Sequence, residues 1–340
     1  MRILTARDQR FAHHPSAHGG FTLDLDVTDG VVTHAEVLVG NVHRSAEKLF
    51  ESREYRQAMM LANRHDWTSP FTGELGLAIA VERALGIEVP ERARSLRTLL
   101  SEMFRLNAAM LFLDGFADRR EFLLTLFEQY CGQRVHPMAA RIGGLAFDAT
   151  DEWLAAVSDY VAQPFETESL RSHAAAFTNV GVLPDAGSFG VSGPVARAAG
   201  ISLDTRYTDP YDAYPIGDPL PTYVASDTAA RIEAMCDSLE QSVTLVRTLS
   251  SSLPSGPVNV RLPKVVKLPE GVAMAAVESA IGTNRTVIVS DATKNPVRLK
   301  LRTASFNNAA ALSTALVGTD EALVAPVVQS FFLVPGDIDR

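Results

Sequence analysis

Three histidines fall within seven residues near the start of this 340-residue sequence, although the chain has 8 histidines in all. They are His13, His14 and His18, in the stretch "HHPSAHG". Imidazole can bind a metal ion, transfer a proton near neutral pH, or donate and accept hydrogen bonds within a turn. The residues alone leave three interpretations open: a metal site, a proton-handling site, or surface residues of a turn.

The common catalytic motifs are missing from the sequence. It contains no Walker A motif, no G-x-G-x-x-G after a strand, no H-E-x-x-H, no paired C-x-x-C and no G-x-S-x-G. Its two cysteines, Cys131 and Cys236, are too few for a disulfide framework or for a thiolate-held metal cluster. Isolated residues such as Arg44, at a helix start, and His136, before a proline, are more often structural than functional.

Charge and hydropathy exclude several classes of protein. The formal net charge is −9, which argues against a general nucleic-acid-binding protein. No apolar run approaches the roughly 20 residues that a membrane-spanning helix needs. The opening stretch "MRILTARDQRF" has no apolar core of the kind a signal peptide carries. We therefore expect no membrane span and no signal peptide.

The elements that must position these residues are mainly helical. Alternation over residues 21–42 predicts two strands joined by a turn at Asp29 and Gly30. Helical spacing of apolar residues predicts helices at about 43–65, 72–87, 90–113, 119–131, 149–162 and 225–250. The runs "MAAVES", "RTVIVSD" and "VRLKLRTAS" are β-like and precede a final helix.

These elements predict a mainly α member of the α+β class. We expect a central helical bundle, with small antiparallel β elements near the N-terminus and in the C-terminal third. Residues 1–340 are interpreted as one domain with an N-terminal β region (1–42), a helical bundle (43–255) and a C-terminal β/α region (256–340). The Gly-, Pro- and Asp-rich stretch 179–221 is predicted to be a long ordered loop, and such loops usually carry function or a partner surface.

Six segments, in order, resemble the NuoD-like family of respiratory complex I, the NADH:quinone oxidoreductase. That family is related to the large subunits of nickel–iron hydrogenases. "HPSAHG" resembles its HPSTHG loop, and "VHRSAEKLFE" its HRG-x-EKL-x-E helix. The other similar segments are "AVERALGIEVPERA", "GQRVHPMAARIGG", "FGVSGPVARAAGISLDTRYTDPYDAY", and a C-terminal group "AAVES", "VSDATKNPVRLKLRTASF" and "PGDIDR".

The resemblance implies a peripheral-arm subunit of a proton-translocating complex. In such a complex this chain forms the quinone-binding site and contacts the terminal iron–sulfur cluster held by the neighbouring B-type subunit. The resemblance further implies that the chain binds no cofactor of its own, that the whole complex uses NAD, and that the B-, C-, H- and I-type subunits are its partners. Membrane contact is then made through partner subunits, on the cytoplasmic side of the cell membrane.

The family's quinone-site residues map onto three positions. His18 matches the histidine that hydrogen-bonds the quinone headgroup, where imidazole can also supply a proton. Trp67, in "RHDW", stands where the family has a tyrosine; an indole N–H donates a hydrogen bond but does not release a proton as a phenol does. Asp118, or alternatively Asp114, stands in for the aspartate that pairs with the loop histidine, in a segment shorter than the family's.

Arg44 and His136 match the arginine and histidine that approach the partner's terminal cluster. The resemblance implies that a guanidinium and an imidazole beside the cluster sulfurs raise its reduction potential through charge and hydrogen bonding.

Two other functions need to be weighed, and one of them remains as an alternative. A hydrogenase needs four thiolates, but Asp66, Ser69, Val334 and Asp337 occupy those positions, so ligand chemistry excludes it and we expect no bound metal. The second alternative is a non-catalytic, degenerate scaffold subunit of a complex I- or hydrogenase-like membrane complex with a different electron donor. Trp67 and the shortened segment 106–118 favour that alternative, whereas His18, Arg44 and His136 argue against it.

Overall fold

The computed structural model describes residues 2–5, 20–214 and 218–340. Its strands are β1 (Arg2–Thr5), β2 (Thr22–Thr28), β3 (Val31–Leu38), β4 (Ala140–Arg141), β5 (Gly144–Leu145), β6 (Gly271–Ser279), β7 (Gly282–Ser290) and β8 (Arg298–Arg302). Its α-helices are α1 (Ala46–Glu51), α2 (Tyr55–Ala62), α3 (Pro70–Leu85), α4 (Glu91–Phe112), α5 (Ala117–Cys131), α6 (Asp151–Ala162), α7 (Glu168–Ala174), α8 (Gly193–Ala198), α9 (Thr205–Thr208), α10 (Thr228–Ser251), α11 (Ala304–Leu316), α12 (Val324–Gln329) and α13 (Pro335–Ile338). Short 3₁₀ turns lie at Ala175–Phe177, Ala186–Phe189 and Glu321–Leu323.

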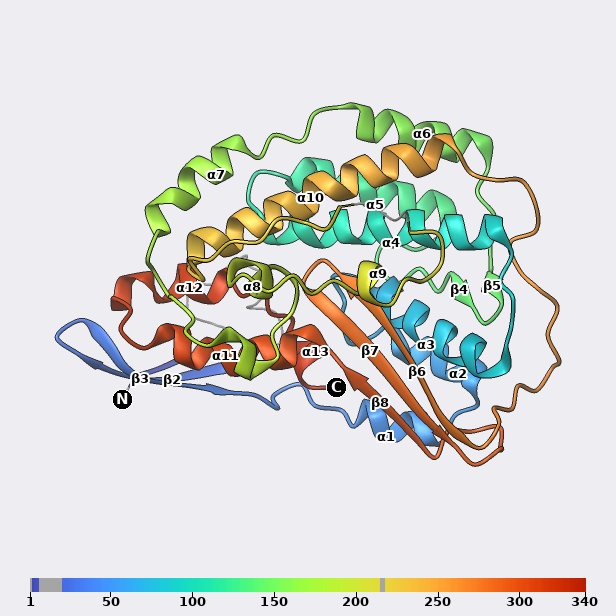
Figure 1. Ribbon diagram of the computed structural model, residues 1–340, viewed down its shortest axis with the longest axis horizontal. Coiled ribbons are helices and arrows are strands. Elements are labelled where there is room, and N and C mark those ends of the chain that lie inside the picture. The colour runs from blue at the N-terminus through green and yellow to red at the C-terminus, as the bar shows by residue number, and fades with distance from the viewer. Residues whose placement is uncertain (1, 6–19, 215–217) are drawn as a thin grey trace.

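A layer of long helices forms the main core (Figure 1). Helix α4 starts after Pro90, whose ring is tolerated at a helix start. It presents apolar residues at intervals of three and four, and Leu96, Leu99 and Met103 are fully buried. It packs against α10 and α5, and the ring of Phe104 stacks on Phe127 with centroids 4.1 Å apart.

The C-terminal sheet is antiparallel, in the order β6–β7–β8, and packs one face on α3. The inward side chains are mostly apolar and include Val277, Ile288, Leu299 and Leu301, all buried. The opposite face of the sheet carries basic and exposed apolar residues. This alternation is what a sheet with one solvated face requires.

A second hydrophobic cluster joins the two ends of the chain. The antiparallel sheet β1–β2–β3 places Leu23, Leu25 and Val32 against α11 and α12. Gly30, at φ 80°, completes the predicted turn between β2 and β3. The C-terminus therefore lies close to the β3–α1 linker, and this closeness builds the site described below (Figure 1).

The predicted fold class is confirmed: the chain is mainly α, with small antiparallel sheets near the N-terminus and in the C-terminal third. The single helix predicted over 43–65 is wrong, because α1 ends at Glu51 and α2 begins after Glu54. Glu54 and Gln57 form a capping box that starts a new helix at this point.

The stretch 179–221 is ordered over its described residues and contains α8 and α9. Buried ion pairs hold it to the bundle: the Arg206 guanidinium lies 2.6 Å from Asp204 and 3.2 Å from Glu102 of α4. In the part of the chain the structure describes, no helix is both long and apolar enough to span a bilayer.

Candidate functional site

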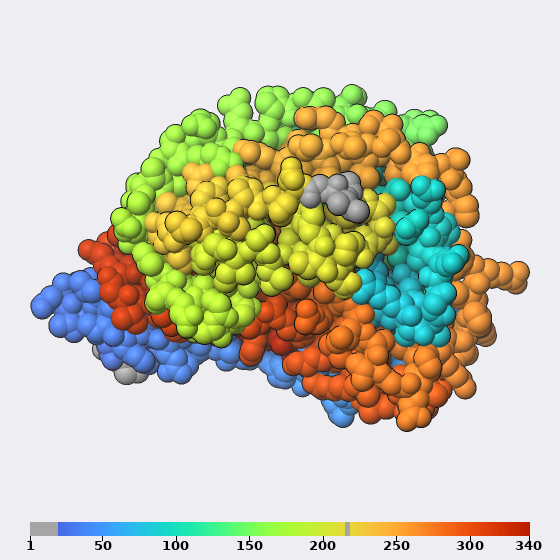
Figure 2. Space-filling view, in the orientation of Figure 1, coloured from blue at the N-terminus to red at the C-terminus, as the bar shows by residue number. Residues whose placement is uncertain are grey.

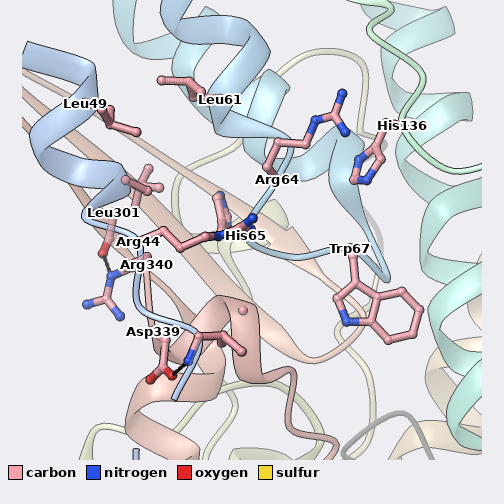
Figure 3. Close-up of a pocket in the computed structure, with 13 residues that line it drawn as sticks. Arg44, Leu49, Leu61, Arg64, His65, Trp67, His136, Leu301, Asp339 and Arg340 are labelled. Carbon is pink, nitrogen blue, oxygen red and sulfur yellow. Dashed lines mark hydrogen bonds between the residues drawn. The ribbon is translucent and has the colours of Figure 1, made fainter. Parts of the chain in front are cut away.

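A cavity of about 600 Å³ opens where segments distant in sequence meet (Figure 3). Its wall is formed by the β3–α1 linker, the end of α2 and the turn after it, the segment before β4, the end of β8, and the C-terminal residues after α13. Arg44, Trp67 and His136 all line it, so three of the five residues singled out from the sequence share one cavity.

Asp339, near the C-terminus, positions the linker that carries Arg44. Its carboxylate accepts hydrogen bonds from the backbone N–H of Gly40 (2.7 Å) and of Val42 (2.9 Å). His43 Nδ1 donates to the Asp339 carbonyl at 3.1 Å. Asp339 therefore holds the linker in place. Arg44, which belongs to this linker, lines the cavity with an exposed side chain.

Arg340 is the second cation at this edge. Its Nε donates to the Leu301 carbonyl, and its guanidinium lies 3.4 Å from Glu47 of α1. It also lies over the ring of Phe306, 4.8 Å from the centroid. Arg340 therefore ties β8, α1 and α11 together, while Arg44 has no ion-pair partner among the described residues.

Trp67 lies in the turn between α2 and α3 and packs its half-buried ring against the main core. The preceding residue fixes the turn: Asp66 Oδ1 accepts from Thr68 N–H (3.1 Å), Thr68 Oγ1 (2.6 Å) and Ser69 N–H (3.0 Å). A short polar side chain at a helix start typically caps the backbone in this way. Asn107 of α4 donates to the Thr68 carbonyl at 2.8 Å, which attaches the turn to the bundle.

His136 is oriented by a buried carboxylate. Glu74 of α3 accepts from the Asn63 side chain (2.8 Å) and from the backbone N–H of Met138 and Ala140 (both 2.9 Å). His136 Nδ1 then donates to the Asn63 carbonyl at 3.1 Å. Nε2 of the neutral ring is left as an acceptor.

Arg64 affects the protonation of that ring. Arg64 and His136 lie side by side at the cavity wall (Figure 3). Burial and the Arg64 charge lower the pKa of His136 from its usual value. The imidazole is therefore neutral at neutral pH, until a negative charge enters the cavity and favours its protonation.

Two buried acids, Asp66 and Asp337, lie next to the cavity together with His65. His65 Nδ1 donates to Asp337 Oδ1 at 3.0 Å, and His65 Nε2 has no hydrogen-bond partner in the described structure. Asp66 Oδ2 is also buried without a partner in the same described part of the chain. Burial and the nearby Asp337 carboxylate raise the pKa of Asp66 to about 6.

The four positions matched to hydrogenase ligands converge here. Asp66 and Ser69 belong to the α2–α3 turn, Val334 and Asp337 flank the start of α13, and all four are buried. Two carboxylates, a hydroxyl group and an isopropyl group therefore stand where a hydrogenase has four cysteine sulfurs. Across residues 2–5, 20–214 and 218–340, no group of three His, Cys, Asp or Glu side chains is arranged to hold a metal ion.

Two sequence-predicted site residues remain, His18 and Asp118. His18, with His13 and His14, falls outside the described residues. Asp118 is exposed in the first turn of α5 and is not among the residues lining the cavity. Its alternative Asp114 is likewise exposed, in the α4–α5 turn.

Sequence reasoning missed most of the polar residues around the cavity. Arg64, His65, Asp339 and Arg340 line it, yet none was singled out as a site residue. Arg64 and His65 belong to the matched "RHDW" motif, and "PGDIDR" carries the other two, so the motifs gave a signal. The contacts join residues almost 300 positions apart, such as Gly40 with Asp339, and no local pattern reports them.

The cavity has a positive electrostatic character. Arg44 and Arg64 are exposed and have no carboxylate partner among the residues described, and Asp339 accepts from two backbone amides. Such a wall stabilises negative charge that develops on a bound group. The half-buried Trp67 ring adds an apolar surface to this wall.

The fold places the chain in a class of proteins that is represented among solved structures. Over 100% of the chain and 98% of its counterpart, the structure matches a chain of the membrane-bound sulfane sulfur reductase, an archaeal respiratory membrane complex, with a TM-score of 0.88 and 30% identity. The chain therefore has the fold of a subunit of a multi-subunit, membrane-associated respiratory oxidoreductase.

Sequence comparison specifies the family within that class. The family model for the 49 kDa subunit of respiratory-chain NADH dehydrogenase matches residues 107–268 and 262–340. The second D-type NADH-quinone oxidoreductase subunit of Streptomyces griseus subsp. griseus is 42% identical over 96% of this chain and 90% of that protein. The D-type subunit of Geobacillus thermodenitrificans is 32% identical over 96% of each. The chain belongs to the NuoD-like family of NADH-quinone oxidoreductase subunits, as the sequence motifs predicted.

Proposed function

We propose that this chain forms the quinone-binding site of a proton-translocating, complex I-like NADH:quinone oxidoreductase, beside the terminal iron–sulfur cluster of the B-type subunit. The convergence of Arg44, Trp67 and His136 on one cationic cavity carries the proposal. The family motifs gave Arg44 and His136 a role at the cluster and Trp67 a role at the quinone. All three residues line the same cavity.

Arg44 and His136 act on the cluster side in this proposal. A reduced cluster carries more negative charge than an oxidised one, so an unpaired guanidinium stabilises the reduced state. The neutral His136 ring gains a proton more readily as negative charge approaches, since that charge opposes the effect of Arg64. The B-, C-, H- and I-type subunits are the proposed partners, and membrane contact is made through them on the cytoplasmic side.

Trp67 and His18 act on the quinone side. The Trp67 ring provides an apolar wall, and its indole N–H can donate to a quinone carbonyl. Indole does not release a proton, so protonation of the reduced quinone falls to His18. Asp118 is the proposed partner of that histidine, as the family resemblance implies. The chain needs no cofactor of its own for these roles, and NAD is used elsewhere in the complex.

A second candidate function keeps the same fold without quinone chemistry. The likeness to a sulfane sulfur reductase chain and the replacement of the family tyrosine by Trp67 both favour a scaffold subunit serving another electron donor or acceptor. The two functions differ in one property: only the first requires His18 for turnover.

Replacing His18 by Ala in the assembled complex tests the proposal. Loss of one hydrogen bond and of the proton donor should reduce quinone-dependent turnover roughly ten- to hundred-fold, because one hydrogen bond is worth on the order of 1–3 kcal/mol. Reduction of the iron–sulfur chain by the upstream donor should be unchanged. His13→Ala and His14→Ala are the matched controls and should retain most of the turnover. Full quinone reduction by the His18→Ala complex would contradict the quinone-site role of this chain and leave the scaffold function in its place.

A further inference from the structure

The outer face of the C-terminal sheet carries two arginines directly opposite each other. Arg285 on β7 and Arg302 on β8 are register partners in an antiparallel pair, so their side chains share one face. Like charges at such positions destabilise a sheet. Burial and the charge of Arg285 lower the pKa of Arg302 from its usual value, which reflects this repulsion.

The two arginines lack a carboxylate on the side that faces solvent. Arg302 donates to the carbonyls of Thr283 (3.3 Å) and Gly190 (2.5 Å), and Arg285 is exposed with no hydrogen-bond or ion-pair partner in the described part of the chain. Asp209, an acid that borders the same side, is engaged by Arg83 at 2.8 Å.

Glu278, a buried acid on β6, is also hydrogen-bonded. Glu278 accepts from Thr205 N–H and Oγ1 and from Thr283 Oγ1, at 3.0–3.2 Å, with Oε2 alone. Glu278 shares the face of Arg302, because it pairs with Thr283 in the β6–β7 register, and its charge attracts Arg302. In the described part of the chain, no carboxylate lies within ion-pair distance of Arg285.

The surface around Arg285 and Arg302 is hollowed, and it adjoins an exposed apolar surface. A hollow of about 500 Å³ lies between α9, the end of α3 and the sheet strands, on the face of the molecule drawn in Figure 2. In the β6–β7 register, Val272 and Met274 lie on the same face as Arg285, and their side chains are 66% and 55% exposed. Strand β6 is an edge strand of the sheet.

We propose that this outer face is a docking surface for a neighbouring subunit of the complex. Its occupant is a segment that presents a carboxylate to Arg285 and Arg302 and apolar side chains to Val272 and Met274. Charge complementarity selects this partner, because a carboxylate between two guanidinium groups removes their repulsion and accepts charge-assisted hydrogen bonds. The proposal rests on the proposed function only in that the chain works within a multi-subunit complex.

Arg285→Glu should move stability and assembly in opposite directions. In the isolated full chain it turns a like-charged cross-strand pair into an oppositely charged one, so the midpoint of thermal unfolding should rise. In the complex it repels the incoming carboxylate, so partner retention on purification should fall on the order of tenfold. Arg261→Glu is the matched control, since Arg261 is exposed outside the sheet and the charge change is identical. Normal partner retention with Arg285→Glu would overturn the proposal, as would equal loss with Arg261→Glu.

Photocrosslinking in the intact complex identifies the occupant. A benzophenone side chain at position 274 should capture a peptide of a neighbouring subunit with Asp or Glu close to the crosslinked residue, and the same probe at exposed Val224 should not capture that peptide. Replacing the captured acid by Lys should restore assembly of the Arg285→Glu complex. Capture of a second copy of this chain, of a segment without carboxylates, or of no subunit would contradict the proposal. None of these readouts depends on quinone reduction, so a failure of the quinone proposal remains distinguishable.

Discussion

Arg44 is an exposed cation with no ion-pair partner among the described residues, held at the cavity by a linker that Asp339 fixes. Arg44→Met should lower the midpoint potential of the partner's terminal cluster, because a positive charge that favours the reduced state is removed. A unit charge about 10 Å away contributes roughly 1–2 kcal/mol at an effective dielectric near 20, on the order of tens of millivolts. Redox titration of the assembled complex measures this shift.

The control for that titration is Arg53→Met, which removes an exposed arginine that does not line the cavity. It should leave the cluster potential unchanged. Equal potentials for wild type and Arg44→Met would show that Arg44 is not beside the cluster.

Asp66 should make the folded chain less stable as the pH rises from about 4 to about 6. Its pKa is raised to about 6 by burial and by Asp337, so the folded state binds more protons than the unfolded state over that range. Asp66→Asn cannot ionise and retains an oxygen for the hydrogen bonds that Oδ1 accepts. It should therefore be more stable than wild type at pH 7.5, on the order of 1–3 kcal/mol, and the difference should shrink towards pH 4.

Thermal unfolding at the two pH values checks the Asp66 prediction. Asp159→Asn, at an exposed position of α6, is the control. A stability difference for Asp66→Asn that is the same at both pH values would contradict it.

At the scale of elements, α3 is the helix on which the cavity depends. Gly73 lets it approach the end of α2: a Cβ there would lie 1.9 Å from the Ala62 carbonyl oxygen and 2.8 Å from His65 Nε2. Two consecutive residues of α3 therefore shape the site. Gly73 leaves space for the His65 ring, and Glu74 orients His136.

Gly73→Ala should destabilise the chain by roughly 1–3 kcal/mol, although alanine favours helices, because overpacking outweighs propensity. Denaturant unfolding measures this loss. Gly187→Ala is the matched control, since a Cβ there meets nothing within 4 Å. Equal stability of the two variants would mean that the α2–α3 contact relaxes freely.

Elements with a strong local period were predictable, and the contacts between them were not. Helix α4, the β2–β3 hairpin and the C-terminal strands follow from apolar spacing and from turn residues such as Gly30. The break between α1 and α2 was missed, because a capping box at Glu54 overrides an apolar period that continues across it. Strand β1 was also missed, since it has only four residues and pairs with β2 across a long intervening segment, so no short hairpin pattern indicates it.

At the scale of the molecule, family motifs supplied what local patterns could not. Arg44, Trp67 and His136 were selected by motif, and the fold brings them to one cavity. Asp118 was selected in a segment that departs from the family, and the fold leaves it exposed on α5. The buried acids Asp66 and Asp337 come from positions far apart in the chain, and sequence alone does not report that they lie close together.

We propose that electrons pass through this cavity from the partner's cluster to quinone, and that the Trp67 ring forms one wall of the quinone site. The measurement that tests it most directly is the rate at which added quinone reoxidises the pre-reduced terminal cluster in the assembled Trp67→Ala complex. We predict a rate roughly ten-fold or more below wild type, because a large apolar contact with the headgroup is lost, with donor-side reduction of the cluster unchanged. Trp67→Tyr should match or exceed the wild-type rate. Wild-type reoxidation by the Trp67→Ala complex would contradict the account.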